Sequence, residues 1–138
     1  MLALEALQRR SSDVWPEYRD QLAAHPDAIE LPRAFIDNGW VRVALDDGTV
    51  IGFSVLIPGE GRVHELDGLF VEPEHMGRGA GRALVEDAVA RATANRGERI
   101  EVTAGPAQGF YERVGFTTTG SAQTRFGPAV RMVRVLQA

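Results

Sequence analysis

Residues 69–84 read LFVEPEHMGRGAGRAL, and this stretch decides the fold. It begins as an apolar strand, passes through a loop with one proline, and continues through Gly77, Gly79 and Gly81 into a segment with helical periodicity. Backbone N–H groups at the start of a helix have no partner inside the helix, and the helix dipole is positive there. Because glycine has no Cβ, the main chain can approach a ligand closely. The stretch therefore predicts a strand–loop–helix unit that binds an anion.

The charges around this predicted helix start favour a phosphate ligand. Arg78 and Arg82 flank it, whereas the acids that usually occupy a first turn come later. A dinucleotide fingerprint needs glycine or alanine at its sixth position, but counting from Gly77 or Gly79 that position is Arg82 or Leu84. A Walker A loop needs a lysine, and the chain contains none. The alternative is a glycine-rich turn that binds nothing.

The rest of the chain alternates between helical and strand patterns. Alternating apolar residues around an Asp47-Gly48 turn predict a hairpin. The expected helices are residues 2–24 in two pieces, with Pro16 opening the second, then 27–37, 79–95 and 106–114. The expected strands are residues 41–45, 50–57, 62–71, 99–103, 116–123 and 129–136. Antiparallel strands followed by β-α-β units predict an α/β (α+β) fold with helices packed against a mixed sheet.

Composition narrows the class of protein. A length of 138 residues suits a single domain, which we expect to cover residues 1–138. The chain has no cysteine, which excludes disulfides, thiolate metal sites and a cysteine nucleophile. A net charge of −4 without a basic stripe argues against a nucleic-acid partner. No apolar run could span a membrane and the first residues have no secretory pattern, so we expect a cytoplasmic protein without a membrane partner.

Two segments of the chain resemble the GNAT family of N-acetyltransferases. Residues 69–84 resemble the family's acetyl-CoA motif, an apolar strand with V-x-P followed by Q/R-x-x-G-x-G/A at a helix start. Residues 107–116, AQGFYERVGF, resemble the family's A-x-x-F-Y-E-K-x-G-F segment, with one strand between the two motifs. Met76 stands where the first motif usually has Gln or Arg, and Ala104 or Gly105 stands where an Asn often precedes the second. The resemblance covers about residues 40–136, and the first 38 residues match nothing specific.

The resemblance implies a GNAT-like acyl-CoA N-acyltransferase fold, with a central, mostly antiparallel sheet and helices on both faces. It also implies acetyl-CoA as the co-substrate, with the pyrophosphate on the glycine loop, the pantetheine along the preceding strand, and no metal. The residues expected to bind coenzyme A are Leu69, Phe70, Val71, Met76, Gly77, Arg78, Gly79, Ala80, Gly81 and Arg82.

Acetyl transfer to an amine that is protonated at neutral pH needs a base for the ammonium proton and an acid for the leaving thiolate. The resemblance points to Tyr111 as the acid, since a phenol with a reference pKa of about 10 stays protonated. A packing role among neighbouring phenylalanines is the alternative for Tyr111. For the base we favour Glu65, which shares a strand face with Asp67 if no bulge intervenes, because two nearby carboxylates raise one pKa. Glu101 is the alternative base.

The acceptor implied by the resemblance is a primary amine of an unidentified small molecule or peptide, and a homodimer is left open. Two other functions remain open at this point. A catalytically degenerate domain could bind acyl-CoA as a sensor or interaction module, and a structural domain would bind no ligand at all.

Overall fold

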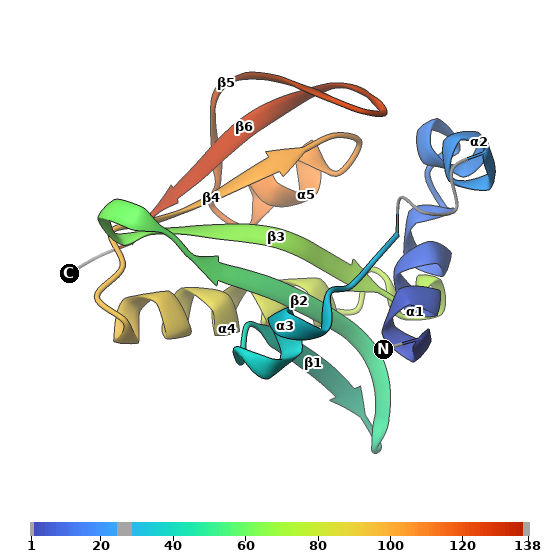
Figure 1. Cartoon of the computed structure of the whole chain (residues 1–138), viewed down its shortest axis with the longest axis horizontal. Helices are drawn as coiled ribbons and strands as arrows, with labels where there is room; N and C mark the ends of the chain where they lie inside the picture. The colour runs from blue at the N-terminus through green and yellow to red at the C-terminus, as the bar shows by residue number, and fades with distance from the viewer. Residues whose placement is uncertain (1, 25–28, 137–138) are drawn as a thin grey trace. The chain divides into compact units, whose positions relative to one another are not determined.

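The computed structural model describes residues 2–24 and 29–136 (Figure 1). The helices are α1 (Leu2–Ser12), α2 (Pro16–Ala24), α3 (Arg33–Asp37), α4 (Ala80–Ala94) and α5 (Gln108–Arg113), with short 3-10 turns η2 (Glu60–Arg62) and η3 (Pro73–His75). The strands are β1 (Val41–Asp46), β2 (Thr49–Pro58), β3 (Val63–Val71), β4 (Arg99–Ala104), β5 (Thr117–Thr124) and β6 (Gly127–Val135). The chain divides into two compact units, one of residues 1–55 and 68–84 and the other of residues 56–67 and 85–138.

The strands form one mixed sheet in the order β1-β2-β3-β4-β6-β5. The pairs β1–β2, β4–β6 and β5–β6 are antiparallel, whereas β3 pairs with β4 in parallel. The mixed α/β fold predicted from the sequence is therefore confirmed. The parallel register joins residues 63–65 to residues 99–101.

In the first unit, the β1–β2 hairpin turns at Asp47 and Gly48, whose φ angles of 51° and 80° are both left-handed. This is the conformation that matches the right-handed twist of two strands joined by a two-residue turn. Behind the hairpin, Phe53 of β2 is fully buried, and its ring centroid lies 5.2 Å from that of Phe70 in β3. The α1 helix contributes Leu7 to the buried residues of this unit.

In the second unit, the side chains of β4 alternate strictly between a buried and a more exposed face. Ile100 and Val102 are buried, as are Val85, Ala88 and Ala92 of α4. The other face of β4 carries the polar residues Arg99, Glu101 and Thr103. In Figure 1, β4, β6 and β5 of this unit lie side by side, so polar side chains from neighbouring strands can meet on that face.

The prediction of a helix over residues 27–37 is wrong in its first half. The helix begins at Arg33, residues 29–32 are not helical, and residues 27–28 lie outside the described residues. Pro32 precedes the helix with φ −58° and ψ 134°, an extended conformation. Because a proline disfavours the helical region for the residue before it, Leu31 stays extended and the helix can only start afterwards.

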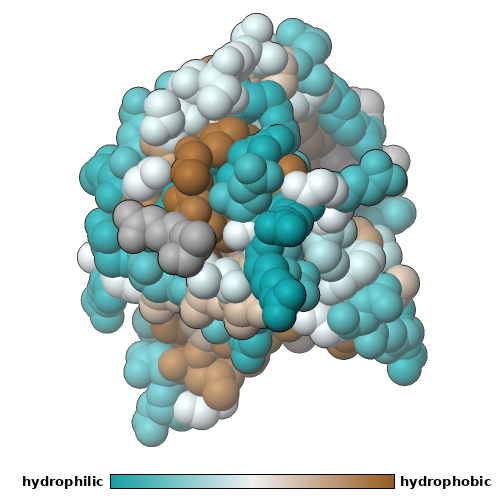
Figure 2. All heavy atoms as spheres, turned by 90° about the vertical axis from the view of Figure 1, so that its left-hand side faces the viewer, coloured by the Kyte–Doolittle hydropathy of each residue, from teal (hydrophilic) through white to brown (hydrophobic). Residues whose placement is uncertain are grey.

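No helix within residues 2–24 and 29–136 is long and apolar enough to cross a membrane. In the same ranges, no three His, Asp or Glu side chains are grouped so that they could hold a metal ion. Hydrophilic residues cover much of the face that Figure 2 shows, with apolar side chains between them.

Candidate active site

The glycine loop between β3 and α4 depends on two left-handed residues. Gly77 has φ +77° and Gly79 has φ +92°, a region that residues with a Cβ rarely adopt. A Cβ built on either glycine would meet no atom of the protein within 4 Å. The two glycines are thus needed for the backbone conformation, and the space in front of them is open to a ligand.

The N-terminal end of α4 lies directly after this loop. The first intrahelical bond runs from the Ala83 N–H to the Gly79 carbonyl over 2.9 Å, so the N–H groups of residues 80–82 have no acceptor inside the helix. The first turn of α4 contains no acid. Arg78 and Arg82 are exposed, and the Met76 side chain that replaces the usual Gln or Arg is 37% exposed. This arrangement fits the pyrophosphate of coenzyme A on chemical grounds.

The end of β3 has one side turned to β2 and one side turned away. The Glu72 N–H donates to the Ile51 carbonyl over 2.8 Å, and a Cβ on Gly52 would lie only 2.8 Å from the Phe70 carbonyl oxygen. Since main-chain groups alternate along a strand, those of Leu69 and Val71 point away from β2. The Val71 N–H donates to the Ser11 hydroxyl oxygen of α1 over 3.2 Å. The main chain of Leu69 is therefore the part of the predicted pantetheine segment that points to the open side of the strand.

Ser11 and its neighbour Arg10 are site residues that the sequence reasoning did not identify. The Arg10 guanidinium makes two hydrogen bonds to the Glu72 carboxylate, of 2.8 Å and 2.6 Å. Arg10 lowers the pKa of Glu72 below its ordinary value, mainly through these hydrogen bonds. One signal was present in the sequence: Ser11 follows the buried Leu7 by four residues, so it lies on the apolar face of α1.

In the second unit, Glu65 is part of a charged cluster on the polar face of β3, β4 and β6. Arg131 of β6 makes hydrogen bonds to both carboxylate oxygens of Glu65, of 3.0 Å and 3.1 Å. The same guanidinium donates to Glu101 over 2.7 Å and to the Thr103 hydroxyl over 2.6 Å. Arg99 holds the second oxygen of Glu101 over 2.8 Å. Glu65 and Glu101, the two candidate bases, thus share one arginine.

The pKa values of Glu101 and Asp67 are shifted in opposite directions. Hydrogen bonds from Arg99 and then from Arg131 lower the pKa of Glu101 below its ordinary value. The pKa of Asp67 is raised, mainly because nearby protein atoms remove part of its hydration and secondly because of the charge of Glu65. One raised pKa was expected from two neighbouring carboxylates, and Asp67 is the residue that has it. The charges of Glu65 and Glu101 are balanced by those of Arg99 and Arg131.

Tyr111 lies in α5 and is 8% exposed. Its ring packs edge-on against Phe110 at 5.2 Å and against Phe116 at 5.4 Å between centroids. The Phe116 N–H also donates to the Tyr111 carbonyl over 2.9 Å. The ring is therefore held firmly in place, which suits a packing residue and an acid of fixed position equally. Ala104, at the place of the usual Asn, is buried.

His64 precedes Glu65 in β3 and faces the opposite side of the strand. His64 is 4% exposed, and burial lowers its pKa. Its Nε2 atom lies 3.2 Å from the Asn95 side-chain nitrogen, on the side of the strand opposite the charged cluster. We therefore do not include His64 among the catalytic candidates.

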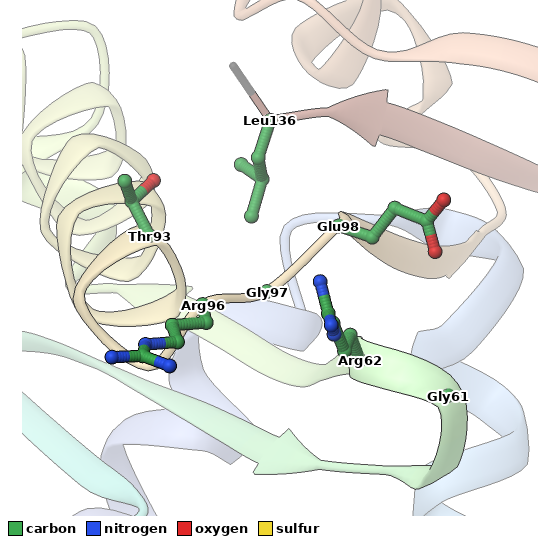
Figure 3. Close-up of a pocket in the computed structure, with 7 residues that line it drawn as sticks. All are labelled: Gly61, Arg62, Thr93, Arg96, Gly97, Glu98 and Leu136. Carbon is green, nitrogen blue, oxygen red and sulfur yellow. The ribbon is translucent and has the colours of Figure 1, made fainter. Parts of the chain in front are cut away.

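A hollow of about 530 Å³ also lies in the second unit (Figure 3). Its lining residues are Gly61, Arg62, Thr93, Arg96, Gly97, Glu98 and Leu136, none of which was predicted as a site residue. Figure 3 shows that the side chains of Arg62 and Arg96 point in different directions, so they do not converge on one ligand position.

A family model described as the acetyltransferase (GNAT) family matches residues 3–116. The chain belongs to this family. The membership predicted from the two motifs is thereby confirmed. The expectation of an acyltransferase is confirmed at the level of the family. The expectation that the first 38 residues match nothing specific is wrong, because the match begins at residue 3. The described part of those residues contains α1, α2 and α3.

Relatives of this GNAT chain include two bacterial proteins named peptidyl-lysine N-acetyltransferase YjaB. The Escherichia coli protein is 38% identical over 112 residues, which are 78% of this chain and 65% of that protein. The Salmonella typhimurium protein is 34% identical over 125 residues, 87% of this chain and 79% of that protein. This chain thus spans just under two thirds of the length of the Escherichia coli relative.

Solved structures show the same fold at low identity. An aminoglycoside 6'-N-acetyltransferase complexed with coenzyme A has a TM-score of 0.73 and 16% identity, covering 99% of this chain and 92% of that one. The PaiA N-acetyltransferase from Thermoplasma acidophilum in complex with coenzyme A has a TM-score of 0.74 and 18% identity, and the match covers 97% of this chain and 91% of that one. The GNAT-like fold expected from the sequence is confirmed by these likenesses.

The stability of the charged cluster should depend on pH through Glu101. Because its pKa is lowered in the folded chain, the stabilisation is present above the ordinary value of 4.5 and is lost as the pH falls through the folded-state pKa. Glu101→Gln should therefore be less stable than wild type by about 1 kcal/mol at pH 7. In urea unfolding series, this difference should close as the pH falls from about 5 towards 3.

Glu98→Gln is the matched control, since Glu98 is 64% exposed and lies 3.8 Å from Arg99. It should lose little stability at either pH. A Glu101→Gln deficit that stays constant down to acid pH would show that the ion pairs of Glu101 do not contribute.

Proposed function

We propose that residues 1–138 act as one acetyl-CoA-dependent N-acetyltransferase domain that acetylates a primary amine of a peptide or small molecule. The observation that carries the proposal is the glycine loop, where a Cβ on the left-handed Gly77 or Gly79 would meet no protein atom, directly before the N-terminal end of α4. Family membership and the names of the relatives support the reaction type. Two relatives are named for peptidyl-lysine, so a lysine side chain is the first acceptor to test.

The residues proposed to hold coenzyme A belong to the first unit. The N–H groups of residues 80–82 and the Arg78 guanidinium would bind the pyrophosphate, and the main chain of Leu69 would bind the pantetheine. The remaining members of the proposed set are Phe70, Val71, Met76, Gly77, Gly79, Ala80, Gly81 and Arg82. The bound thioester would supply the activated acetyl group.

The residues proposed for proton transfer belong to the second unit. Glu65 accepts a proton from the acceptor ammonium, which leaves a neutral amine able to attack the thioester carbonyl. As the carbon–sulfur bond breaks, Tyr111 donates its phenolic proton to the departing thiolate, and the proton that the nitrogen loses on forming the amide restores the phenol. The products are the amide and free coenzyme A. Glu101 and Asp67 stay as alternative bases: Glu101 lies in the same cluster, and Asp67 has the raised pKa.

A catalytically degenerate acyl-CoA-binding domain is the second candidate function, and two observations favour it. Both carboxylate oxygens of Glu65 already accept hydrogen bonds from Arg131, so neither oxygen is unoccupied for an acceptor amine. Met76 replaces a motif side chain that could contact phosphate. A domain with these features could bind acyl-CoA as a sensor without turnover.

The test is a panel of amines with acetyl-CoA, with release of free coenzyme A as the readout. Lysine peptides, peptides with free N-termini, polyamines, aminoglycosides and amino acids should be included, and at least one should be acetylated. Gly79→Asp should abolish the reaction and raise the Kd for acetyl-CoA about tenfold or more, because it places a carboxylate in the anion site.

Gly79→Ala is the control for backbone strain, since it adds a Cβ at the same left-handed φ without a charge. It should bind acetyl-CoA better than Gly79→Asp does. Equal Kd values for wild type and Gly79→Asp in calorimetry would rule out the glycine loop as the binding site. Binding without turnover on any amine would favour the sensor function.

Glu65→Gln should lower kcat mainly below pH 8, with partial recovery at higher pH. The physical reason is that the acceptor amine then loses its proton to solvent without a protein base. The measurement is the pH profile of kcat for both proteins on the best amine of the panel. If the two profiles have the same shape, Glu65 is not the base, and Asp67→Asn and Glu101→Gln should be compared next.

Tyr111→Phe keeps the ring packing against Phe110 and Phe116 but removes the proposed proton donor. Loss of a general acid typically costs about a hundredfold to ten-thousandfold in rate, so kcat should fall by that order. The Kd for acetyl-CoA should change little, because the phenol would contact the sulfur only near the transition state. A near-normal kcat would make Tyr111 a packing residue, and a weaker Kd alone would make it a binding residue.

A further inference from the structure

The last turn of α1 is bonded to the last residues of β3, directly before the glycine loop (Figure 1). Two consecutive residues of the helix contact two consecutive residues at the strand end. The Ser11 oxygen accepts the Val71 N–H over 3.2 Å, and Arg10 holds the Glu72 carboxylate over 2.8 Å and 2.6 Å. These contacts link segments about 60 residues apart in the chain, and all four residues belong to the first unit.

The strand end is held from both sides by these bonds. On one side the Glu72 N–H donates to the Ile51 carbonyl of β2. On the other side, away from β2, the Val71 N–H donates to Ser11. Ser11 is 6% exposed and Val71 is 7% exposed, so water has little access to this bond. Removing the hydroxyl would therefore leave a buried N–H without a partner.

Packing alone does not explain a serine at this position. The preceding residue on the same helix face, Leu7, is 2% exposed and fills its place with an apolar side chain. A hydroxyl at position 11 adds little apolar contact, but its oxygen provides the acceptor that the Val71 N–H requires. The next residue, Ser12, lies at the end of the same helix and is only half-buried.

We propose that Ser11, supported by the Arg10–Glu72 ion pair, is a positioning residue for coenzyme A. By fixing Val71 and Glu72, α1 sets the direction in which the chain leaves β3 and enters the glycine loop. It also takes the Val71 N–H, which leaves the main chain of Leu69 and the Val71 carbonyl as the groups for pantetheine on that side of the strand. The inference rests on the proposed binding of coenzyme A at this loop and adds α1 to that site.

The test compares Ser11→Ala with Ser12→Ala, the same substitution one position further along the helix. Calorimetry with coenzyme A should show a Kd about tenfold higher for Ser11→Ala and unchanged for Ser12→Ala, since one buried hydrogen bond at the binding strand is lost. Ser11→Thr, which keeps the hydroxyl, should recover part of the affinity. Amide hydrogen exchange should be faster at Val71 and Glu72 in Ser11→Ala alone.

Arg10→Met provides a second variant on an exposed side chain, for use if Ser11→Ala unfolds in a thermal melt. It should weaken coenzyme A binding in the same direction, and Glu72→Gln should add no further loss to it. If wild type binds coenzyme A and Ser11→Ala and Arg10→Met bind equally well, the role of α1 is refuted while the proposed function stands. If wild type does not bind coenzyme A, the proposed function and this inference fail together.

Discussion

The turn from β3 into α4 is the constraint on which the rest of the first unit depends. The chain must stop pairing as a strand at Val71 and enter a helix at Ala80, within a few residues. Gly77 and Gly79 make this geometry accessible, because both adopt left-handed φ angles. The bonds at Val71 and Glu72 hold the strand at the point where the turn begins. Loop conformation and strand anchoring together therefore shape the proposed anion site.

The second unit is organised around charge rather than around a backbone turn. The face of β4 that does not enter the core carries Glu101 and Arg99, and the neighbouring strands add Glu65 and Arg131. All fifteen basic residues of the chain are arginines, and a guanidinium can serve several acceptors at once. Arg131 does so, because it bonds to Glu65, Glu101 and Thr103 together. A lysine at this position could not hold two carboxylates in the same planar arrangement.

This cluster changes how the proposed catalytic acids have to be understood. An unpaired carboxylate on a strand would be a straightforward base, whereas both oxygens of Glu65 accept hydrogen bonds from one guanidinium, which fixes the orientation of the carboxylate. Whether Arg131 releases Glu65 therefore bears directly on whether the chain is an active acetyltransferase or a binding domain. In the same strand, the pKa of Asp67 is raised, mainly because part of its hydration is lost. Glu65 is therefore not the only carboxylate of this strand that could accept a proton.

Most helices and strands, and the family, could be predicted from local sequence patterns. The Asp47-Gly48 turn, the apolar alternation of the strands and the glycine stretch are local signals, because turn chemistry and side-chain periodicity act within a few residues. The helix predicted over residues 27–37 starts later, at Arg33, because Pro32 disfavours a helical conformation for the residue before it. The strand–loop–helix unit predicted over residues 69–84 is confirmed, because the turn between strand and helix requires glycines with left-handed φ angles at Gly77 and Gly79.

Only the tertiary structure decided which groups contact one another across the chain. Ser11 bonds to Val71 across 60 residues, and Arg131 bonds to Glu65 across 66. Neither pairing has a signature in local sequence, since a serine on an apolar helix face or an arginine in a strand is compatible with many partners. Hydrogen bonds of this kind depend on the register of strands and on helix packing, which are set by the burial of residues distributed over the whole unit. The sequence could therefore name the candidate base, but the fold determined that an arginine holds it.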